Sequence, residues 1–204
     1  MKLLIAVPAH DYIHTDFVNC FLKLIDKLKR DGIDFEYNIM SGTLVYIARD
    51  KLARYAINNG FTHVLWLDAD MIFEDTLLDD LMFCGKDFVT GIAHARRKPY
   101  LSCIFKSLST CEHFTEYGSE PFKVAGCGFA CVLIKVDILT HVMLTFQTCF
   151  LPQMKLGEDL AFCDRAHYCG YEIWAEPTVR LGHIGQIAIY PEDHERYMEQ
   201  IVRE

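Results

Sequence analysis

The chain has 204 residues, of which 51% are hydrophobic and 24% are charged. This length suits one domain with a real core, and the composition is that of a globular protein rather than a disordered one. The formal net charge of −8 disfavours a general attraction to nucleic acid or to anionic membranes, without forbidding contact through a local patch.

The nine cysteines include no CxxC pair, which disfavours a zinc knuckle. We interpret them as reduced, mostly buried apolar residues in a reducing compartment. The first apolar run, Leu3 to Val7, ends at Pro8 and is too short for a signal peptide. Later apolar runs are interrupted by polar residues, so we expect a cytoplasmic protein without a membrane anchor.

The first 70 residues alternate between short apolar runs and segments with helical periodicity. The predicted order is strand 3–7, helix 15–32, strand 35–40, helix 43–60 and strand 63–67. Thr15 or Asp16 is expected to cap the first helix, and Gly32 to end it. Alternation of this kind predicts parallel strands joined by right-handed crossovers.

The second half is less regular in sequence. The predicted elements are a short helix 75–83, strands 88–91, 102–106 and 129–134, a helix from Asp137, a helix 157–170, short strands 171–177 and 179–185, and a C-terminal helix 191–204. A turn is expected at Gly126-Cys127-Gly128. We therefore predict a single α/β domain over 1–204, a Rossmann-type three-layer sandwich with a mainly parallel central sheet flanked by helices.

Three predicted loops follow the first three strands. They contain Pro8-Ala9-His10-Asp11, Ser41-Gly42 and Asp68-Ala69-Asp70. Because ligands of such sheets bind beyond the carboxyl ends of the strands, we expect these loops to converge on one crevice.

Asp68 and Asp70 stand out because they directly follow a strand that reads as buried. Two neighbouring carboxylates repel each other unless they share a cation, and Mg²⁺ and Mn²⁺ prefer such oxygen ligands. Alternation along an extended chain points both in the same direction, and Ala69 leaves room for a ligand. A helix cap or a solvated strand end remains the alternative, because a D-x-D pattern is weak by itself.

Three further segments accompany this pattern in a fixed order: "IARDKLARYAI" (47–57), "VAGCGFACVLIKVDIL" (124–139) and "GEDLAFCDRAHYCGYEIWAEPTVRLGHIG" (157–185). With Asp68-Ala69-Asp70, the chain resembles the small, soluble, DxD-containing glycosyltransferases of the GT-A fold, of bacterial or phage type. The resemblance runs from residue 3 to about residue 190. Asp50 departs from it, because the family usually has Asn there.

The resemblance implies a metal-dependent transfer of a sugar from a nucleotide-diphosphate sugar, with a mild preference for UDP, to an acceptor hydroxyl. Residues 1–95 form the nucleotide-binding half, and 96–204 the acceptor-binding and catalytic half. Mn²⁺ or Mg²⁺ would be held by Asp68, Asp70 and His183. The implied nucleotide-sugar contacts are Pro8, Ala9, His10, Asp11, Ser41, Arg49, Asp50, Leu67, Asp68, Ala69, Gly126 and Gly128. Nucleic acid is disfavoured as the acceptor but not excluded.

Glu158 and Asp159 open a predicted helix, where the helix dipole is expected to favour their ionised forms and to lower their pKa values. Two acidic residues at this position could also serve only to stabilise the start of the helix, without a catalytic role. The resemblance instead makes Asp159 the base that takes the acceptor proton, with Glu158 orienting the acceptor. Direct displacement would invert the anomeric carbon, although a retaining outcome stays open.

His183 lies in "LGHIG", where the two glycines permit a tight loop; a lone histidine is more often a core or surface residue. For Arg96-Arg97-Lys98, two interpretations are equally consistent with the sequence. The cluster is either a solvated loop or a contact to phosphate, donor sugar or an acidic acceptor.

Three other interpretations compete with glycosyl transfer. A nucleotidyltransferase should carry a glycine-rich loop after the first strand, where this chain has Pro8-Ala9-His10-Asp11. A dehalogenase-like phosphatase should place its D-x-D after the first strand rather than the third. A binding module that has lost catalysis has little reason to keep Asp68, Asp70, Glu158, Asp159 and His183 together.

Overall fold

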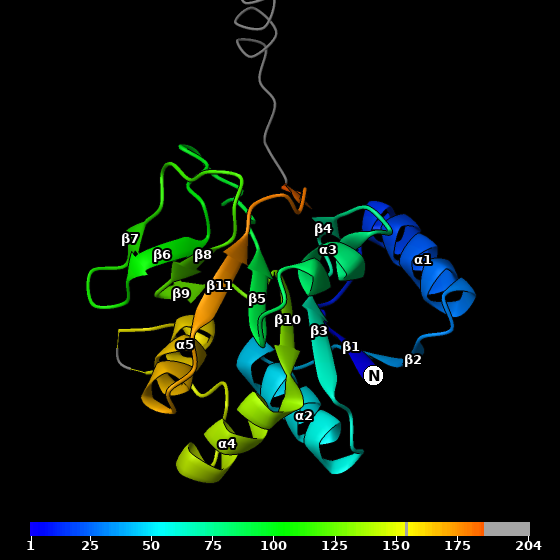
Figure 1. The fold of residues 1–204 in the computed structure, drawn as a ribbon, viewed down its shortest axis with the longest axis horizontal. Coiled ribbons are helices and arrows are strands. Elements are labelled where there is room, and N and C mark those ends of the chain that lie inside the picture. The colour runs from blue at the N-terminus through cyan, green and yellow to red at the C-terminus, as the bar shows by residue number, and fades with distance from the viewer. Residues whose placement is uncertain (154, 186–204) are drawn as a thin grey trace, which may run out of the picture.

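The computed structural model describes residues 1–153 and 155–185. Its centre is a seven-stranded sheet in the order β2-β1-β3-β10-β5-β11-β8 (Figure 1). The strands are β1 (Lys2–Pro8), β2 (Asp34–Met40), β3 (His63–Leu67), β5 (Phe88–Gly91), β8 (Phe122–Val124), β10 (Cys131–Lys135) and β11 (Ile173–Glu176).

Five strands of this sheet run in the same direction, and β10 and β8 run against them. The mainly parallel sheet is therefore confirmed. The reversal of β10 has a local cause, because the chain reaches it from the carboxyl end of the parallel strands. Ala130, directly before β10, accepts a hydrogen bond from the amide of Asp68, directly after β3, at 3.0 Å.

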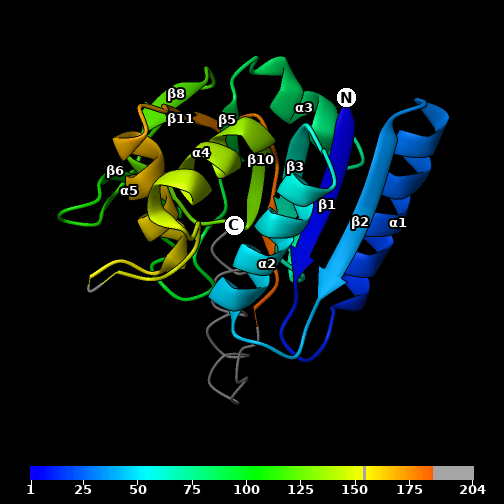
Figure 2. The ribbon, with the colours of Figure 1, turned by 90° about the horizontal axis from the view of Figure 1, so that it is seen from below.

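Helices cover both faces of the sheet (Figure 2). Helices α1 (Thr15–Arg30) and α3 (Leu77–Phe83) pack on one face, and α2 (Val45–Asn58), α4 (Val136–Phe146) and α5 (Glu158–Tyr168) on the other. Alternation along β1 supplies both interfaces, because Leu3 and Ile5 enter one core cluster while Leu4 and Ala6 enter the other. The predicted three-layer α/β sandwich is confirmed.

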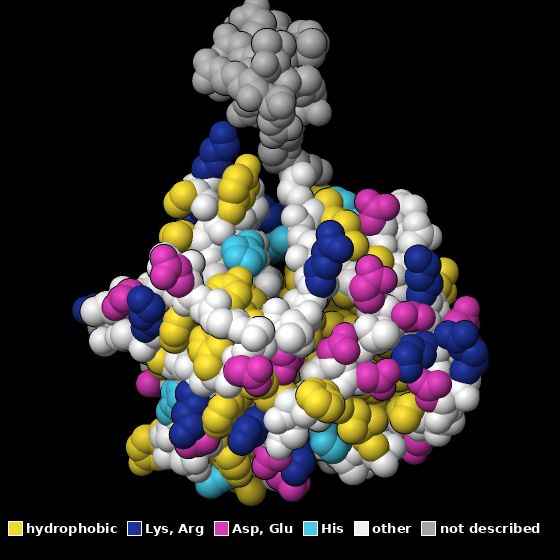
Figure 3. Space-filling model, turned by 45° about the horizontal axis from the view of Figure 1, so that its top comes forward, with side chains coloured by type: hydrophobic (Ala, Val, Ile, Leu, Met, Phe, Trp, Pro, Cys, Tyr) yellow, Lys and Arg dark blue, Asp and Glu magenta, His cyan; other side chains and the backbone are white. Residues whose placement is uncertain are grey.

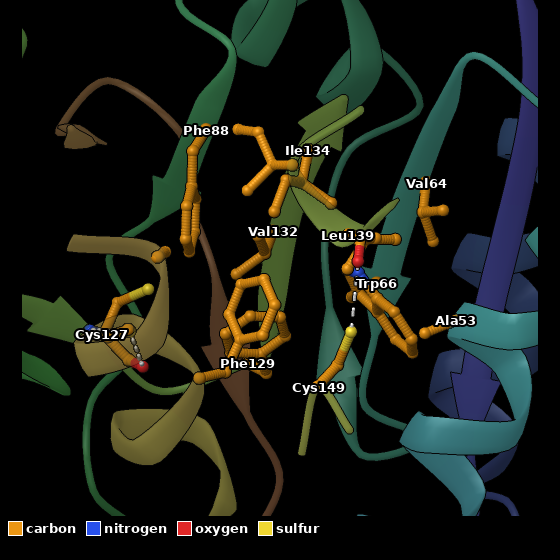
Figure 4. Close-up of a cluster of buried hydrophobic side chains, with 14 of the residues drawn as sticks. Ala53, Val64, Trp66, Phe88, Cys127, Phe129, Val132, Ile134, Leu139 and Cys149 are labelled. Carbon is orange, nitrogen blue, oxygen red and sulfur yellow. Dashed lines mark hydrogen bonds between the residues drawn. The ribbon is translucent and has the colours of Figure 1, made fainter. Parts of the chain in front are cut away.

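Aromatic side chains fill the core beneath the end of β3 (Figure 4). The ring of Phe129 meets Trp66 edge-on at 6.0 Å between centroids, Phe88 at 6.0 Å and Phe150 at 5.1 Å. All four side chains are fully or almost fully buried. Close packing of this kind fixes the backbone on either side, so the core holds both Asp68 and Gly128 in place.

Two smaller sheets stand outside the main one: β7 (Glu112–His113), β6 (Ile104–Ser107) and β9 (Gly126–Cys127), and the pair β4 (Met71–Ile72) and β12 (Gly182–His183). The predicted strand 102–106 is therefore β6, shifted and outside the main sheet. The predicted Gly126-Cys127-Gly128 turn is wrong at its first two residues, which pair with β6. The predicted strand 179–185 shrinks to Gly182–His183.

The ends of the first helix differ partly from expectation. Thr15 is its first residue rather than its cap, and the residue at the cap position, His14, makes no side-chain capping bond to the described part of the chain. Gly32 ends the helix as predicted, with a φ of 68° that favours glycine. The second helix begins at Val45, and the predicted helix 191–204 lies outside the described residues.

The cysteines are less buried than predicted: Cys127, Cys131, Cys149 and Cys163 are buried, and the other five are partly exposed. All nine are free thiols. Across residues 1–153 and 155–185, no helix has both the length and the apolar character needed to cross a membrane.

Candidate functional site

A cleft of about 370 Å³ lies beyond the carboxyl ends of β1 and β3. Its lining includes six of the residues that the sequence singled out: Pro8, Ala9, His10, Asp68, Ala69 and Asp70. The amide of His14, in the loop after β1, donates to the carbonyl of Ala69, in the loop after β3, at 3.4 Å. The amide of Ala9 donates to the carbonyl of Met40 at the end of β2 at 2.8 Å, which joins the loop after β1 to that strand as well. Two of the three expected loops, those after β1 and β3, line the cleft with the residues named from the sequence, whereas Thr43 lines it from the loop after β2 in place of Ser41 and Gly42.

Five lining residues were missed or left undecided: Tyr12, His14, Thr43, Val45 and Arg96. Tyr12 and His14 belong to the loop after β1, so the same strand-end argument could have included them. Arg96 follows β5, whose carboxyl end lies at the same edge of the sheet.

Other predicted residues do not line this cleft. Leu67 is buried in the core against the α1 and α3 layer. Asp11 and Ser41 are exposed beside the cleft, and Asp11 pairs with His10 at 2.7 Å.

Arg49 lies inside the protein, with 3% of its surface exposed. Its Nη2 donates to Asp68 Oδ1 and its Nη1 to Glu158 Oε1, both at 2.8 Å, and the guanidinium stands 5.5 Å from the Phe129 ring centroid. Burial alone lowers the pKa of Arg49, but the charges of Asp68, Glu158 and Asp159 outweigh it and raise that pKa. Arg49 therefore ties the end of β3 to the start of α5.

Asp50 has a separate task in the structure. Its Oδ1 accepts hydrogen bonds from the Thr148 hydroxyl at 2.9 Å and from the amides of Cys149 and Phe150 at 2.7 and 3.3 Å. Its Oδ2 accepts from Arg54 at 3.0 Å. These contacts hold the loop after α4, and Asp50 is not part of the cleft lining.

Asp70 meets His183 across the β4–β12 pair. Its Oδ1 lies 3.5 Å from His183 Nε2. His183 Nδ1 lies 2.7 Å from the His94 carbonyl, which can only accept, so Nδ1 carries the proton and Nε2 faces Asp70. Burial raises the pKa of Asp70, but contact with His183 and the charge of Arg96 outweigh it and lower that pKa.

The fit of this group to a divalent ion is partial. Within the described ranges, no three His, Cys, Asp or Glu side chains are grouped closely enough to hold a metal ion. Asp68 Oδ1 already accepts a hydrogen bond from Arg49 at 2.8 Å. Asp70 and His183 do fit, because one histidine nitrogen is fixed by a carbonyl, as in metal-ligating histidines, and a cation, the Arg96 guanidinium, already occupies Asp70 Oδ2 at 2.6 Å.

Asp159 lies at the start of α5 beside Gly128. Its Oδ1 accepts from the amide of Leu160 at 2.7 Å, and a Cβ on Gly128 would stand 3.7 Å from its Oδ2. The expected lowering of its pKa is wrong. Burial raises the pKa of Asp159 and the Glu158 charge adds to that rise, which outweighs the opposing effect of Arg49.

Gly126 and Gly128 have different surroundings. A Cβ on Gly126 would come within 2.6 Å of Leu108 Cδ2 and 3.1 Å of Leu160 Cδ2. Protein side chains thus occupy the space that a side chain at position 126 would need, so this glycine allows close packing against α5. Gly128 instead faces Cys103 and Asp159, so it adjoins the carboxylate predicted as the base.

Acidic and basic side chains are mixed on the face drawn in Figure 3, with no continuous basic stripe. This agrees with the net charge of −8.

No protein-family model matches the chain, and neither does any curated protein. Solved structures do match. A197 from STIV superposes with a TM-score of 0.63 at 20% identity, over 91% of this chain and 87% of A197. A UDP-glucose pyrophosphorylase complexed with UDP-glucose superposes with a TM-score of 0.55 at 10% identity, over 98% and 99% of the two chains.

GalNAc-T7, solved with UDP, GalNAc and Mn²⁺, superposes with a TM-score of 0.53 at 11% identity, over 98% of this chain and 48% of that one. At these identities the likeness concerns the fold. The chain shares a Rossmann-like α/β fold with proteins whose structures hold UDP or a UDP-sugar.

Proposed function

We propose that this protein is a glycosyltransferase that uses a nucleotide-diphosphate sugar. One observation carries the proposal: Asp68 and Asp70 open from the end of β3 into the cleft, and the chain returns at β12 to bring His183 to Asp70. A purely structural pairing of β4 with β12 would not require two carboxylates to face the cleft at the same point. Residues 1–95 would supply most of the donor site and 96–204 most of the acceptor site.

The donor nucleotide would lie against the loop after β1 and the start of α2, where Pro8, Ala9, His10, Tyr12 and Thr43 line the cleft. Asp70 and His183, with Asp68 beside them, would hold Mn²⁺ or Mg²⁺. The ion supplies Lewis-acid stabilisation of the departing diphosphate. Asp70 would supply a carboxylate oxygen, which both ions prefer as a ligand.

Asp159 would take the proton of the acceptor hydroxyl as that oxygen attacks the anomeric carbon, with inversion. Its raised pKa makes it a stronger base than an exposed aspartate, provided the pH is high enough to ionise it. Arg49 would keep Glu158 at a fixed orientation next to it.

A nucleotidyltransferase is the second candidate, since UDP-glucose pyrophosphorylase shares the fold. The loop after β1 counts against it, because residues 8–14 contain no glycine that would let a backbone cradle phosphates. The two candidates differ in product: a sugar joined to an acceptor, or pyrophosphate exchange with a nucleoside triphosphate.

The first experiment is calorimetric titration of UDP, GDP, CDP and ADP, each with and without Mn²⁺. We expect one diphosphate to bind in a Mn²⁺-dependent manner, and Asp70→Asn to abolish that dependence. Glu74→Gln is the matched control, because Glu74 is an exposed acid a few residues further along the chain. Absence of binding of every nucleotide by the folded protein would refute the proposal, and binding with pyrophosphate exchange alone would favour the second candidate.

A further inference from the structure

Arg96 makes the closest charged contact at the proposed metal site. Its Nη1 lies 2.6 Å from Asp70 Oδ2, while the other carboxylate oxygen faces His183. The Arg96 side chain is 53% exposed, whereas that of Asp70 is 20% exposed. A half-exposed cation therefore sits on a carboxylate that is largely withdrawn from solvent.

The same side chain borders three adjoining hollows. Arg96 lines the 370 Å³ cleft with Asp68 and Asp70, a second hollow of about 600 Å³ with His183, and a third of about 290 Å³ with Tyr100. Arg96 therefore has open space on more than one side.

The base of the Arg96 side chain is held firmly. A Cβ on Gly185 would stand 3.3 Å from Arg96 Cβ, so the segment after β12 packs directly against it. The surrounding backbone forms a tight loop, in which the Ala95 amide donates to the Leu101 carbonyl at 2.8 Å and the Tyr100 amide to the Arg97 carbonyl at 2.9 Å. These contacts involve the backbone and the base of the side chain, so a movement of Arg96 would mainly concern its guanidinium end.

A divalent ion and this guanidinium compete for Asp70. Mn²⁺ or Mg²⁺ would approach a carboxylate oxygen to about 2.1 Å, and a guanidinium on the same carboxylate would repel it. Repulsion between the two cations therefore favours departure of Arg96 from Asp70 when the ion binds. A planar guanidinium released beside a cleft is well suited to a phosphate, which it can bind through two parallel hydrogen bonds.

We propose that Arg96 is a displaceable counter-ion of Asp70, which the divalent ion replaces and which then binds the diphosphate of the donor. The role in the donor complex rests on the proposed function. Ion and diphosphate would bind cooperatively, because each removes an obstacle to the other: the ion frees the guanidinium, and the diphosphate receives it.

The test has two measurements, in which removal of the Arg96 charge is expected to raise the affinity for Mn²⁺ and to lower the affinity for pyrophosphate. Mn²⁺ alone is titrated into wild type and Arg96→Gln and followed by electron paramagnetic resonance; we expect the variant to bind Mn²⁺ about fivefold or more tightly. Pyrophosphate is then titrated by calorimetry at saturating Mn²⁺; we expect the variant to bind it about tenfold more weakly. Arg97→Gln, with the same charge change at the neighbouring position, should show no gain in Mn²⁺ affinity.

Arg96→Lys is a second variant that keeps the charge without the planar fork. It should compete with Mn²⁺ as wild type does and still bind pyrophosphate more weakly. Unchanged or weaker Mn²⁺ binding by Arg96→Gln, in a protein with wild-type circular dichroism, would overturn the role of Arg96 alone. Failure of Mn²⁺ to bind to wild type and to every variant would refute the metal site, and with it the proposed function.

Discussion

At the scale of single residues, Arg49 is a buried cation that depends on two carboxylates of the candidate site. Its guanidinium satisfies two carboxylates from different elements, and removal of it leaves both without their cation. Its Nε has no hydrogen-bond partner among the described residues, so the buried pairing is not complete. A buried ion network of this kind fixes the positions of its charged groups more than it stabilises the fold.

Arg49→Met should destabilise the protein by about 3–5 kcal/mol, because Asp68 and Glu158 then keep their charges without compensation. Urea unfolding followed by circular dichroism measures this. The triple variant Arg49→Met, Asp68→Asn, Glu158→Gln removes the stranded charges and should recover a large part of the loss. A single variant as stable as wild type would show that the network contributes little.

Asp159 should make stability depend on pH. Its pKa in the folded protein is raised above the ordinary value of 3.8, so the folded state keeps this proton to a higher pH than the unfolded state does. Stability is therefore lost as pH rises from 3.8 through the raised pKa. Asp159→Asn removes that loss.

The variant Asp159→Asn should accordingly be more stable than wild type at neutral pH, and the difference should vanish below the ordinary pKa. Urea unfolding at a series of pH values measures both. If Asp159 is the base, the same variant should retain donor binding and lose turnover. A variant less stable than wild type at neutral pH would contradict the burial argument.

At the scale of elements, the contact between β9 and α5 places the candidate base. Helix α5 approaches β9 closely because Gly126 has no side chain: Leu160, which follows Asp159 in the chain, lies 3.1 Å from the place of a Cβ. The resemblance implies Gly126 as a nucleotide-sugar contact, and the structure shows that Leu108 and Leu160 lie where its Cβ would be. A glycine in a sequence indicates that another group approaches the backbone closely, but it does not identify that group.

Gly126→Ala should push α5 away from β9 and cost about 1–3 kcal/mol of stability, because Leu108 and Leu160 already occupy the place of the new methyl group. Thermal unfolding by calorimetry measures the loss. Gly118→Ala is the matched control, because a Cβ there has nothing within 4 Å. Equal behaviour of the two variants would mean that the side chains around Gly126 can move aside.

At the scale of the whole molecule, the first half of the fold follows from the sequence. Hydrophobic runs and helical spacing predict β1, α1, β2, α2 and β3, and the strand-end rule then places Asp68 and Asp70 beside the loop after β1. These predictions succeed because the elements are consecutive and each crossover is local. The glycosyltransferase resemblance added His183, which the structure brings to Asp70.

The second half could not be predicted in the same way. The direction of β10 depends on the side from which the chain enters the sheet, and the segments before it, β6 to β9, are too short to show a clear period. Arg49 and Asp50 show the same limit for the site, because helical spacing cannot tell a buried cation from a surface one. Arg96 was visible as part of a basic cluster, but its partner is far away in the sequence.

The pairing of β4 with β12 involves only two residue pairs, yet it joins Asp70 to the segment that carries His183. Small hydrogen-bonded units open more easily than a seven-stranded sheet packed on both faces. The proposed site would therefore come apart before the fold does. On warming, activity would fade while the protein still shows its full secondary structure, and cooling would restore it.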